Sequence, residues 1–219
     1  MLMSLDGKIS TGDNDLLDFD ADLPKLKGIG DGLKQYYQLE QKTDLHSLNT
    51  GRVMEKIGIN RRKDNPEKTP VSFIIIDNKP HLNKNGIRYL SKKLKKLYIV
   101  TTNAKHPADS LNLCNVEIIH LKKLNLSGLL RNLKSKYKID KLTIQSGGTL
   151  NSAFIRESLI DHVSVVVAPC LVGGKDTSTL VDGESLHSAG ELKKIRCLKL
   201  RSCMALKGSY LHLKYDVIN

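Results

Sequence analysis

The segment TIQSGGTL, residues 143–150, places two adjacent glycines where strand-forming residues give way to a helical pattern of apolar residues. Glycine lets backbone approach a ligand closely, and the free N–H groups of a helix's first turn attract an anion. At the carboxyl end of a parallel strand, Gly147 and Gly148 therefore predict a site for a phosphate group or a dinucleotide diphosphate. An ordinary strand-to-helix turn has the same sequence, and no GxGxxG motif follows an early strand.

The other potential ligands do not form a metal site in the sequence. The four cysteines and seven histidines show no CxxC pair, no HExxH motif and no shared spacing. We therefore expect neither a bound metal nor a disulfide framework.

The formal net charge of +12 favours a polyanionic partner, either nucleic acid or small phosphorylated molecules. The lysine runs lack the interleaved aromatic residues of single-strand binders, which makes nucleic acid the less favoured partner. No apolar run reaches the roughly 20 residues of a membrane helix, and the start MLMSLDGK does not resemble a secretory signal. We expect a cytoplasmic protein without a membrane partner.

A regular alternation of strands and helices begins near residue 71 and must position these groups. Residues 71–77 form a β-branched run typical of a strand buried on both faces, residues 86–96 have helical apolar spacing, and residues 97–102 return to a strand. The same alternation continues with a strand over 116–121, a helix over 127–136 that Ser127 is expected to cap, a strand over 141–145, a helix over 149–159 and a strand over 162–174.

This order predicts an α/β fold with a mainly parallel central sheet and helices on both faces. Residues 197–206 and 209–218, joined through Lys207-Gly208, predict a C-terminal antiparallel hairpin at a sheet edge. The N-terminal third is expected to hold a short strand turning at Asp6-Gly7, a long loop over 12–32, a helix over 33–42 and a strand over 44–48. Because no linker is visible, we expect residues 1–219 to form a single domain.

Three stretches resemble the reductase domain of riboflavin biosynthesis, the RibD C-terminal domain family with its dihydrofolate-reductase-like fold. They are MSLDGKIS (3–10), SLNTGRVMEK (47–56) and the long segment from IQSGGTLNSAF to VGGKD (144–176). The resemblance implies that NADPH reduces a ribosylaminopyrimidine 5′-phosphate to its ribitylamino form. It also implies a homodimer formed through the sheet edge. No deaminase-like zinc motif precedes the domain, which resembles the stand-alone form.

The resemblance assigns several residues to the cofactor. The segment that holds the pyrophosphate includes Gly147, Gly148, Thr149, Leu150 and Asn151. The glycine-containing turn that contacts the cofactor includes Asn49, Gly51 and Arg52. Thr101 and Thr102 end the strand that meets the adenosine ribose, and Lys105 is either a partner of the 2′-phosphate or a surface lysine. Gly173 and Gly174 either lie close to the nicotinamide or form a plain turn.

On the substrate side, the resemblance places Ser4 and Asp6 beside the nicotinamide and the substrate. Asp6 is the candidate proton donor to the imine nitrogen, with water as the alternative. Gln145 stands where many relatives have a glutamate facing the substrate. Met54 and residues 56–60 depart from the family pattern, and Arg61 or Arg62 would have to bind the substrate phosphate.

Two alternatives remain open from the sequence. A reductase of dihydrofolate or another pteridine-like molecule would keep the fold; the helix over 33–42 offers Glu40, but the chain has no tryptophan. A basic nucleic-acid-binding domain without catalysis would explain the charge alone.

Overall fold

The computed structural model describes residues 1–218 and separates the chain into two compact units. Unit 2 is the continuous segment Asp44–Ser146, and unit 1 combines Met1–Thr43 with Gly147–Asn219. The expectation of a single domain over 1–219 stays a prediction.

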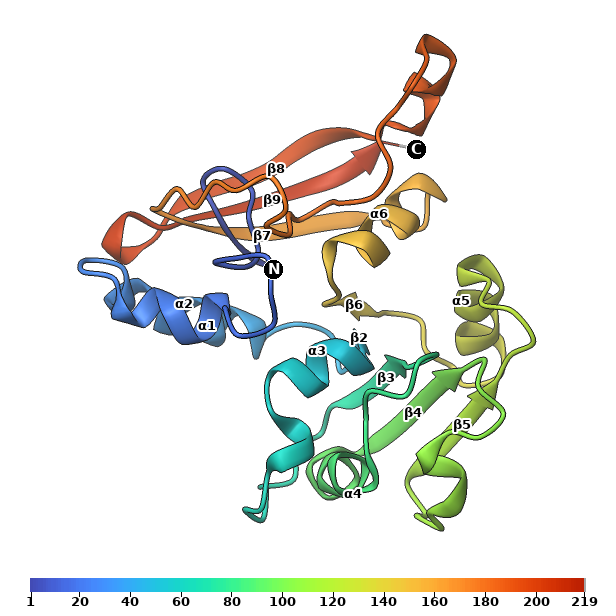
Figure 1. Cartoon of the computed structure of the whole chain (residues 1–219). Helices are drawn as coiled ribbons and strands as arrows, with labels where there is room; N and C mark the ends of the chain where they lie inside the picture. The colour runs from blue at the N-terminus through green and yellow to red at the C-terminus, as the bar shows by residue number, and fades with distance from the viewer. Residues whose placement is uncertain (219) are drawn as a thin grey trace. The chain divides into compact units, whose positions relative to one another are not determined.

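Unit 2 is built on a five-stranded, all-parallel sheet with the strand order β5-β4-β3-β2-β6 (Figure 1). Its strands are β2 (His46–Thr50), β3 (Ser72–Ile76), β4 (Lys96–Thr101), β5 (Val116–His120) and β6 (Thr143–Ile144). Parallel strands covered on both faces need apolar side chains on both faces, and the run Ser72–Ile76 supplies them. The carboxyl ends of all five strands consequently lie along one edge of this sheet.

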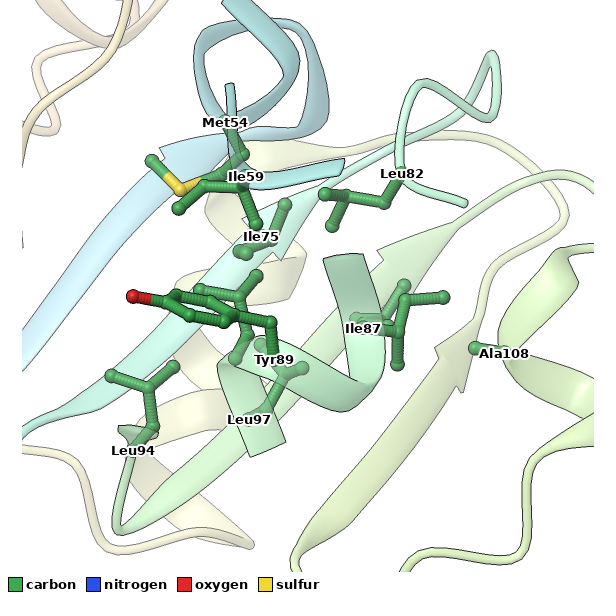
Figure 2. Close-up of a cluster of buried hydrophobic side chains, with 11 residues drawn as sticks. Met54, Ile59, Ile75, Leu82, Ile87, Tyr89, Leu94, Leu97 and Ala108 are labelled. Atoms are coloured by element: carbon green, nitrogen blue, oxygen red, sulfur yellow. The ribbon is translucent and has the colours of Figure 1, made fainter. Parts of the chain in front are cut away.

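Helices cover the two faces of this sheet. On one face, α3 (Gly51–Lys56) and α4 (Lys84–Lys93) pack against the sheet. Figure 2 shows the resulting cluster of buried side chains: Met54, Ile59, Ile75, Leu82, Ile87, Tyr89, Leu90, Leu94, Leu97, Ile99 and Ala108. On the other face, Tyr137, just after α5 (Leu126–Ser135), meets the ring of Tyr98 edge-on with centroids 5.1 Å apart.

Asparagine side chains begin two of these helices. Asn83 Oδ1 accepts from the Gly86 amide at 2.9 Å at the start of α4. At α5 the capping residue is Asn125, whose Oδ1 lies 2.7 Å from the Gly128 amide nitrogen. The prediction that Ser127 caps this helix was wrong, because the helix begins two residues earlier than the apolar pattern suggested.

Unit 1 contains a four-stranded sheet with the order β1-β7-β9-β8. Strand β1 (Leu2–Ser4) pairs parallel with β7 (His162–Ala168), while β9 (Leu211–Ile218) pairs antiparallel with both β7 and β8 (Cys197–Ala205). Helices α1 (Phe19–Asp22), α2 (Gly30–Glu40) and α6 (Gly148–Arg156) belong to the same unit. Its buried core comprises Leu2, Phe19, Leu23, Ile29, Leu33, Val166, Ala168 and Tyr210.

The predicted α/β class is confirmed, including the parallel sheet, the helices and the C-terminal hairpin. The strands are divided between two sheets, and β7 ends at Ala168, so residues 169–174 form a loop. The expectation of a long loop over 12–32 was wrong in part, because α1 lies within it and buries Phe19. No helix within residues 1–218 is long and apolar enough to cross a membrane.

Candidate cofactor and substrate sites

The first turn of α6 leaves three backbone donors available. Gly147 precedes the helix in an extended conformation, and no side chain caps the helix there. Within residues 1–218, the amides of Gly147, Gly148 and Thr149 have no hydrogen-bond acceptor. A Cβ at position 147 would meet nothing within 4 Å. This open backbone at a helix N-terminus has the features of an anion site.

The second glycine of the pair, Gly148, is required for a different reason, which is close packing. A Cβ on Gly148 would lie 2.3 Å from the Thr179 carbonyl oxygen and 2.4 Å from Asp182 Oδ2. The Asp182 amide donates to the Gly148 carbonyl at 3.1 Å, and the Asn151 side chain donates to the Leu180 carbonyl at 2.9 Å. Gly148 and the buried Asn151 therefore hold the 179–182 segment against α6, while Gly147 is the glycine that faces open space.

The SLDGK turn is joined to the loop after β7 by two charged side chains. Asp6 accepts from the amides of Val172 at 3.1 Å and Gly173 at 2.7 Å. Lys8 donates from Nζ to the carbonyl oxygens of Gly174 at 2.5 Å and Thr177 at 2.9 Å. Both loop glycines have positive φ angles, +70° and +82°, which other residues adopt only with strain.

Hydrogen bonding determines the charge of Asp6. The hydroxyl of the fully buried Ser4 donates to Asp6 Oδ1 at 2.5 Å and accepts from the Lys8 amide at 2.9 Å. The Ser4 hydroxyl, followed by the Gly173 and Val172 amides, lowers the pKa of Asp6 to about 2. Asp6 is therefore an ionised acceptor at neutral pH. Both hydrogen bonds of the Ser4 hydroxyl are to residues of its own turn, Asp6 and Lys8.

In unit 2, a chain of polar side chains connects the carboxyl ends of β2 and β6. Asn49 Nδ2 donates to Ser47 Oγ at 3.0 Å, and Ser47 Oγ donates to Gln145 Oε1 at 2.9 Å. Ser47 and Asn49 are buried. Sequence reasoning missed Ser47, although its position two residues before Asn49 in a strand places both side chains on the same face.

The glycine-arginine turn begins α3. The Thr50 hydroxyl accepts from the Val53 amide at 3.3 Å, and Arg52 in the first turn is exposed. Gly51 is buried against the carboxylate of Asp77, which lies directly after β3: a Cβ on Gly51 would lie 2.1 Å from Asp77 Oδ1. Asp77 is the second residue that the sequence did not single out.

At the end of β4 and in the segment that follows it, one predicted cofactor residue is buried and two are exposed. Thr101 is buried; its hydroxyl donates to the Asp77 carbonyl at 2.9 Å and accepts from the Asn103 amide at 3.1 Å. Thr102 and Lys105 are exposed, which leaves their side chains at the surface of this edge. Of the three predicted cofactor residues here, these two have side chains that face solvent.

Arg61 and Arg62 lie at the end of a 3-10 turn, Ile59–Arg61, and both side chains are exposed. Residues 56–60, which depart from the family pattern, include a residue with a structural role. Asn60 donates to the His81 carbonyl at 2.7 Å and accepts from the Asn83 amide at 3.0 Å, which joins this turn to the start of α4. Binding of the substrate phosphate by Arg61 or Arg62 stays a prediction.

Positive charge is concentrated in unit 2. This unit holds 21 of the 35 Lys and Arg residues and 8 of the 23 Asp and Glu residues, a net charge of +13, whereas unit 1 has a net charge of −1. Among the side chains that the structure describes, no group of three or more histidine, cysteine, aspartate or glutamate residues could hold a metal ion. The field of unit 2 suits a polyanionic ligand.

The fold and these turns define an α/β protein of the dihydrofolate-reductase-like class, with donors and glycine turns at the carboxyl ends of its strands. The sequence profile of the RibD C-terminal domain matches residues 1–206, so the chain belongs to this family.

Individual relatives agree with this assignment. The 2,5-diamino-6-ribosylamino-4(3H)-pyrimidinone 5′-phosphate reductase of Methanothermobacter thermautotrophicus is 27% identical over 224 residues, covering 98% of this chain and 94% of the relative. Among solved structures, RibD of Acinetobacter baumannii has the same fold with a TM-score of 0.69 at 19% identity; the match covers 100% of this chain and 57% of that protein. The riboflavin biosynthesis reductase of Saccharomyces cerevisiae gives a TM-score of 0.59 at 16% identity, covering 99% and 87%.

Proposed function

We propose that this chain is an NADPH-dependent reductase that converts a ribosylaminopyrimidine 5′-phosphate to its ribitylamino form in riboflavin biosynthesis. The observation that carries the proposal is the open first turn of α6, where the amides of Gly147, Gly148 and Thr149 have no acceptor among the described residues. Family membership and the name of the Methanothermobacter relative support the choice of reaction.

Each unit contributes residues that fit the cofactor's chemistry. In unit 1, the amides of residues 147–149 would bind the diphosphate through hydrogen bonds and the helix dipole. In unit 2, Gly51, Arg52, Thr102 and the exposed Lys105 would hold the adenosine ribose and its 2′-phosphate. We infer NADPH over NADH because Lys105 and the net charge of +13 favour the extra phosphate.

Bound nicotinamide would supply hydride to the first carbon of the sugar's open-chain imine, and the imine nitrogen must also receive a proton. Asp6 is ionised and accepts from the Val172 and Gly173 amides, so in our proposal it holds the 172–174 loop in place. Water is then the proposed proton source. Gln145, oriented by Ser47, is the proposed contact to the pyrimidine.

Paired glycine variants test the cofactor site. Gly147→Ala should leave the fold intact, because φ is −74° and nothing lies within 4 Å of the new methyl group, yet it should weaken NADPH binding by blocking close approach. Gly148→Ala should instead destabilise the protein through its collision with Thr179 and Asp182. Fluorescence titration with NADPH and thermal unfolding separate the two effects. Unchanged NADPH affinity in Gly147→Ala would contradict the proposed site.

The substrate is tested by comparing NADPH oxidation with the ribosylaminopyrimidine phosphate and with dihydrofolate. We expect turnover with the pyrimidine only. Turnover with dihydrofolate alone would identify a pteridine reductase. Absence of saturable NADPH binding, together with steeply salt-dependent binding to nucleic acid, would replace the enzyme by a nucleic-acid-binding domain.

We also propose a homodimer that forms through the β8 side of the unit 1 sheet and works in the cytoplasm. β8 is an outer strand, and Leu198, Leu200 and Met204 on it are 45%, 53% and 43% exposed. An exposed apolar edge strand is a surface that proteins usually cover. A second copy of this chain would cover it by extending the sheet.

A further inference from the structure

Asp77 is a buried carboxylate that the proposed reaction does not use. Its side chain is fully buried directly after β3. Oδ1 accepts from the His81 amide at 3.0 Å, and Oδ2 accepts from the Leu82 amide at 3.1 Å. A buried charge requires such partners, because burial by itself disfavours ionisation.

The Asp77 carboxylate has two further side-chain partners: the partly exposed His81 ring, whose Nδ1 lies 3.3 Å from Oδ1, and a buried histidine. His106 is only 2% exposed, and its Nε2 lies 3.1 Å from Asp77 Oδ2. The Ala108 amide points at His106 Nδ1 at 3.2 Å, and because an amide can only donate, Nδ1 must be the acceptor. The neutral ring therefore carries its proton on Nε2 and donates it to Asp77.

Burial raises the pKa of Asp77, but the hydrogen bonds from His106, His81 and Leu82 outweigh it, so the pKa lies below its ordinary value. The carboxylate is therefore ionised at neutral pH and attracts the donors that surround it. This charge fixes the direction of the His106 hydrogen bond.

Two candidate cofactor segments meet at this pair. The Asp77 carboxylate occupies the position that a side chain at residue 51 would need, so the start of α3 rests against it. The Asp77 carbonyl accepts from the buried Thr101 hydroxyl at 2.9 Å, and His106 ends the segment that carries Thr102 and Lys105. Asp77 thus touches residue 51 with its side chain and residue 101 with its backbone, all within unit 2.

We propose that Asp77 and His106 are positioning residues that set the relative placement of residues 50–52 and 101–105 for binding the adenosine half of NADPH. This inference rests on the proposed function. The pair contacts these two segments and has no part in the proposed hydride or proton transfer, so we expect it to affect cofactor affinity and not the chemical step.

Two substitutions at one position separate the Asp77 contact from the Ala108 contact. His106→Gln keeps a donor at the Nε2 position for Asp77 but loses the acceptor for the Ala108 amide. His106→Asn keeps that acceptor but loses the donor to Asp77. A role limited to local folding predicts that Asn is tolerated better, whereas the positioning role predicts that Gln is tolerated better.

For His106→Asn we expect the NADPH Kd to rise on the order of 10- to 100-fold, the range found when groups that orient metal ligands are removed. For His106→Gln we expect a Kd near that of the unchanged protein, and for both variants an unchanged kcat at saturating NADPH. The matched control is Asn115→Ala, which breaks bonds to the Ser91 and Leu94 carbonyls at the amino ends of the strands. That variant should lose stability without losing NADPH affinity.

Hydrogen exchange in the cofactor-free chain gives an independent measurement. His106→Asn should speed exchange at residues 50–52 and 101–105, and Asn115→Ala should not. Equal Kd values for the Asn and Gln variants, or unchanged exchange in both segments, would overturn the positioning role. Failure of the unchanged protein to bind NADPH would overturn the proposed function. The exchange measurement uses the cofactor-free chain, so its outcome does not depend on NADPH binding.

Discussion

The Asp6 Oδ2 atom lies 2.7 Å from the amide nitrogen of Gly173, a bond between the first turn of the chain and the loop after β7. The other carboxylate oxygen, Oδ1, accepts from the Val172 amide and from the Ser4 hydroxyl. An aspartate in this setting is an anchor for the loop, because its donors stabilise the ionised form.

Asp6→Asn is therefore expected to lower kcat while leaving the NADPH Kd nearly unchanged, because the amide side chain keeps one acceptor oxygen for three donors, the Ser4 hydroxyl and the Val172 and Gly173 amides. With the pKa of Asp6 at about 2, the pH–rate profiles of the variant and the unchanged enzyme should run parallel from pH 5 to pH 8. Steady-state kinetics across this range provides the measurement. A limb of the profile that disappears in Asp6→Asn would instead show that Asp6 donates the proton.

Lys105→Gln is expected to weaken NADPH binding by up to ~1 kcal/mol, about fivefold, because an exposed ion pair contributes no more. NADH affinity should not change, since NADH lacks the 2′-phosphate. The control is Lys92→Gln, at another exposed lysine, which lies on α4. Titration with both nucleotides at low salt tests this, and equal losses for NADPH and NADH would exclude a 2′-phosphate contact.

Leu200→Lys on β8 is expected to convert the proposed dimer to a monomer, because the apolar side chain is 53% exposed on the outer strand and would be buried by a second copy. Light scattering coupled to gel filtration gives the mass. Leu192→Lys is the control: Leu192 is 58% exposed but belongs to the 3-10 helix Ala189–Lys194 and not to β8. Dissociation by both variants to the same degree would place the interface elsewhere.

Because His212 is buried, we expect the free energy of unfolding to decrease in mild acid. The ring is buried on β9, its Nε2 lies 2.9 Å from Ser164 Oγ, and its Nδ1 has no hydrogen-bond partner among the described residues. Burial, with Lys214 and the N-terminal amine, lowers the pKa of His212 below 6.5. As pH falls below 6.5 the unfolded chain takes up the proton first, so stability declines until the folded pKa is reached.

The decline should not exceed about 1.4 kcal/mol per pH unit for this one group. His212→Leu should flatten it, as measured by urea unfolding between pH 8 and pH 5. Burial also lowers the pKa of His46, so part of the slope should persist until His46→Gln is added. An identical slope in the unchanged protein and in His212→Leu would contradict the assignment.

The repeated strand and helix pattern was predictable because period and β-branching are properties of the chain itself. The apolar run near residue 71 predicted β3 to within a residue, and the alternation near the C-terminus predicted the β8–β9 hairpin. The end of β7 was not predictable, because the residues after Ala168 are apolar but bond to the first turn through Leu5 and Asp6.

The site shows the same division. Glycines and charged residues at strand ends could be selected as candidates from the sequence. The structural reason for each residue could not be predicted. Gly147 faces open space, whereas its neighbour Gly148 is required by Thr179 and Asp182, which lie some thirty positions later in the chain. Ser47, Asp77 and His106 were missed because their importance depends on partners that only the fold brings together.

Unit 1 is interrupted in the sequence: β1 pairs with β7, and everything in unit 2 is encoded between them. During synthesis on a ribosome, the parallel sheet of unit 2 has all its strands once Ser146 has emerged, while the opening segment still lacks its pairing partners. Unit 2, encoded in the middle of the chain, should therefore fold before unit 1. A nascent chain truncated shortly after Ser146 would already resist protease over unit 2 while its first 43 residues are still digested.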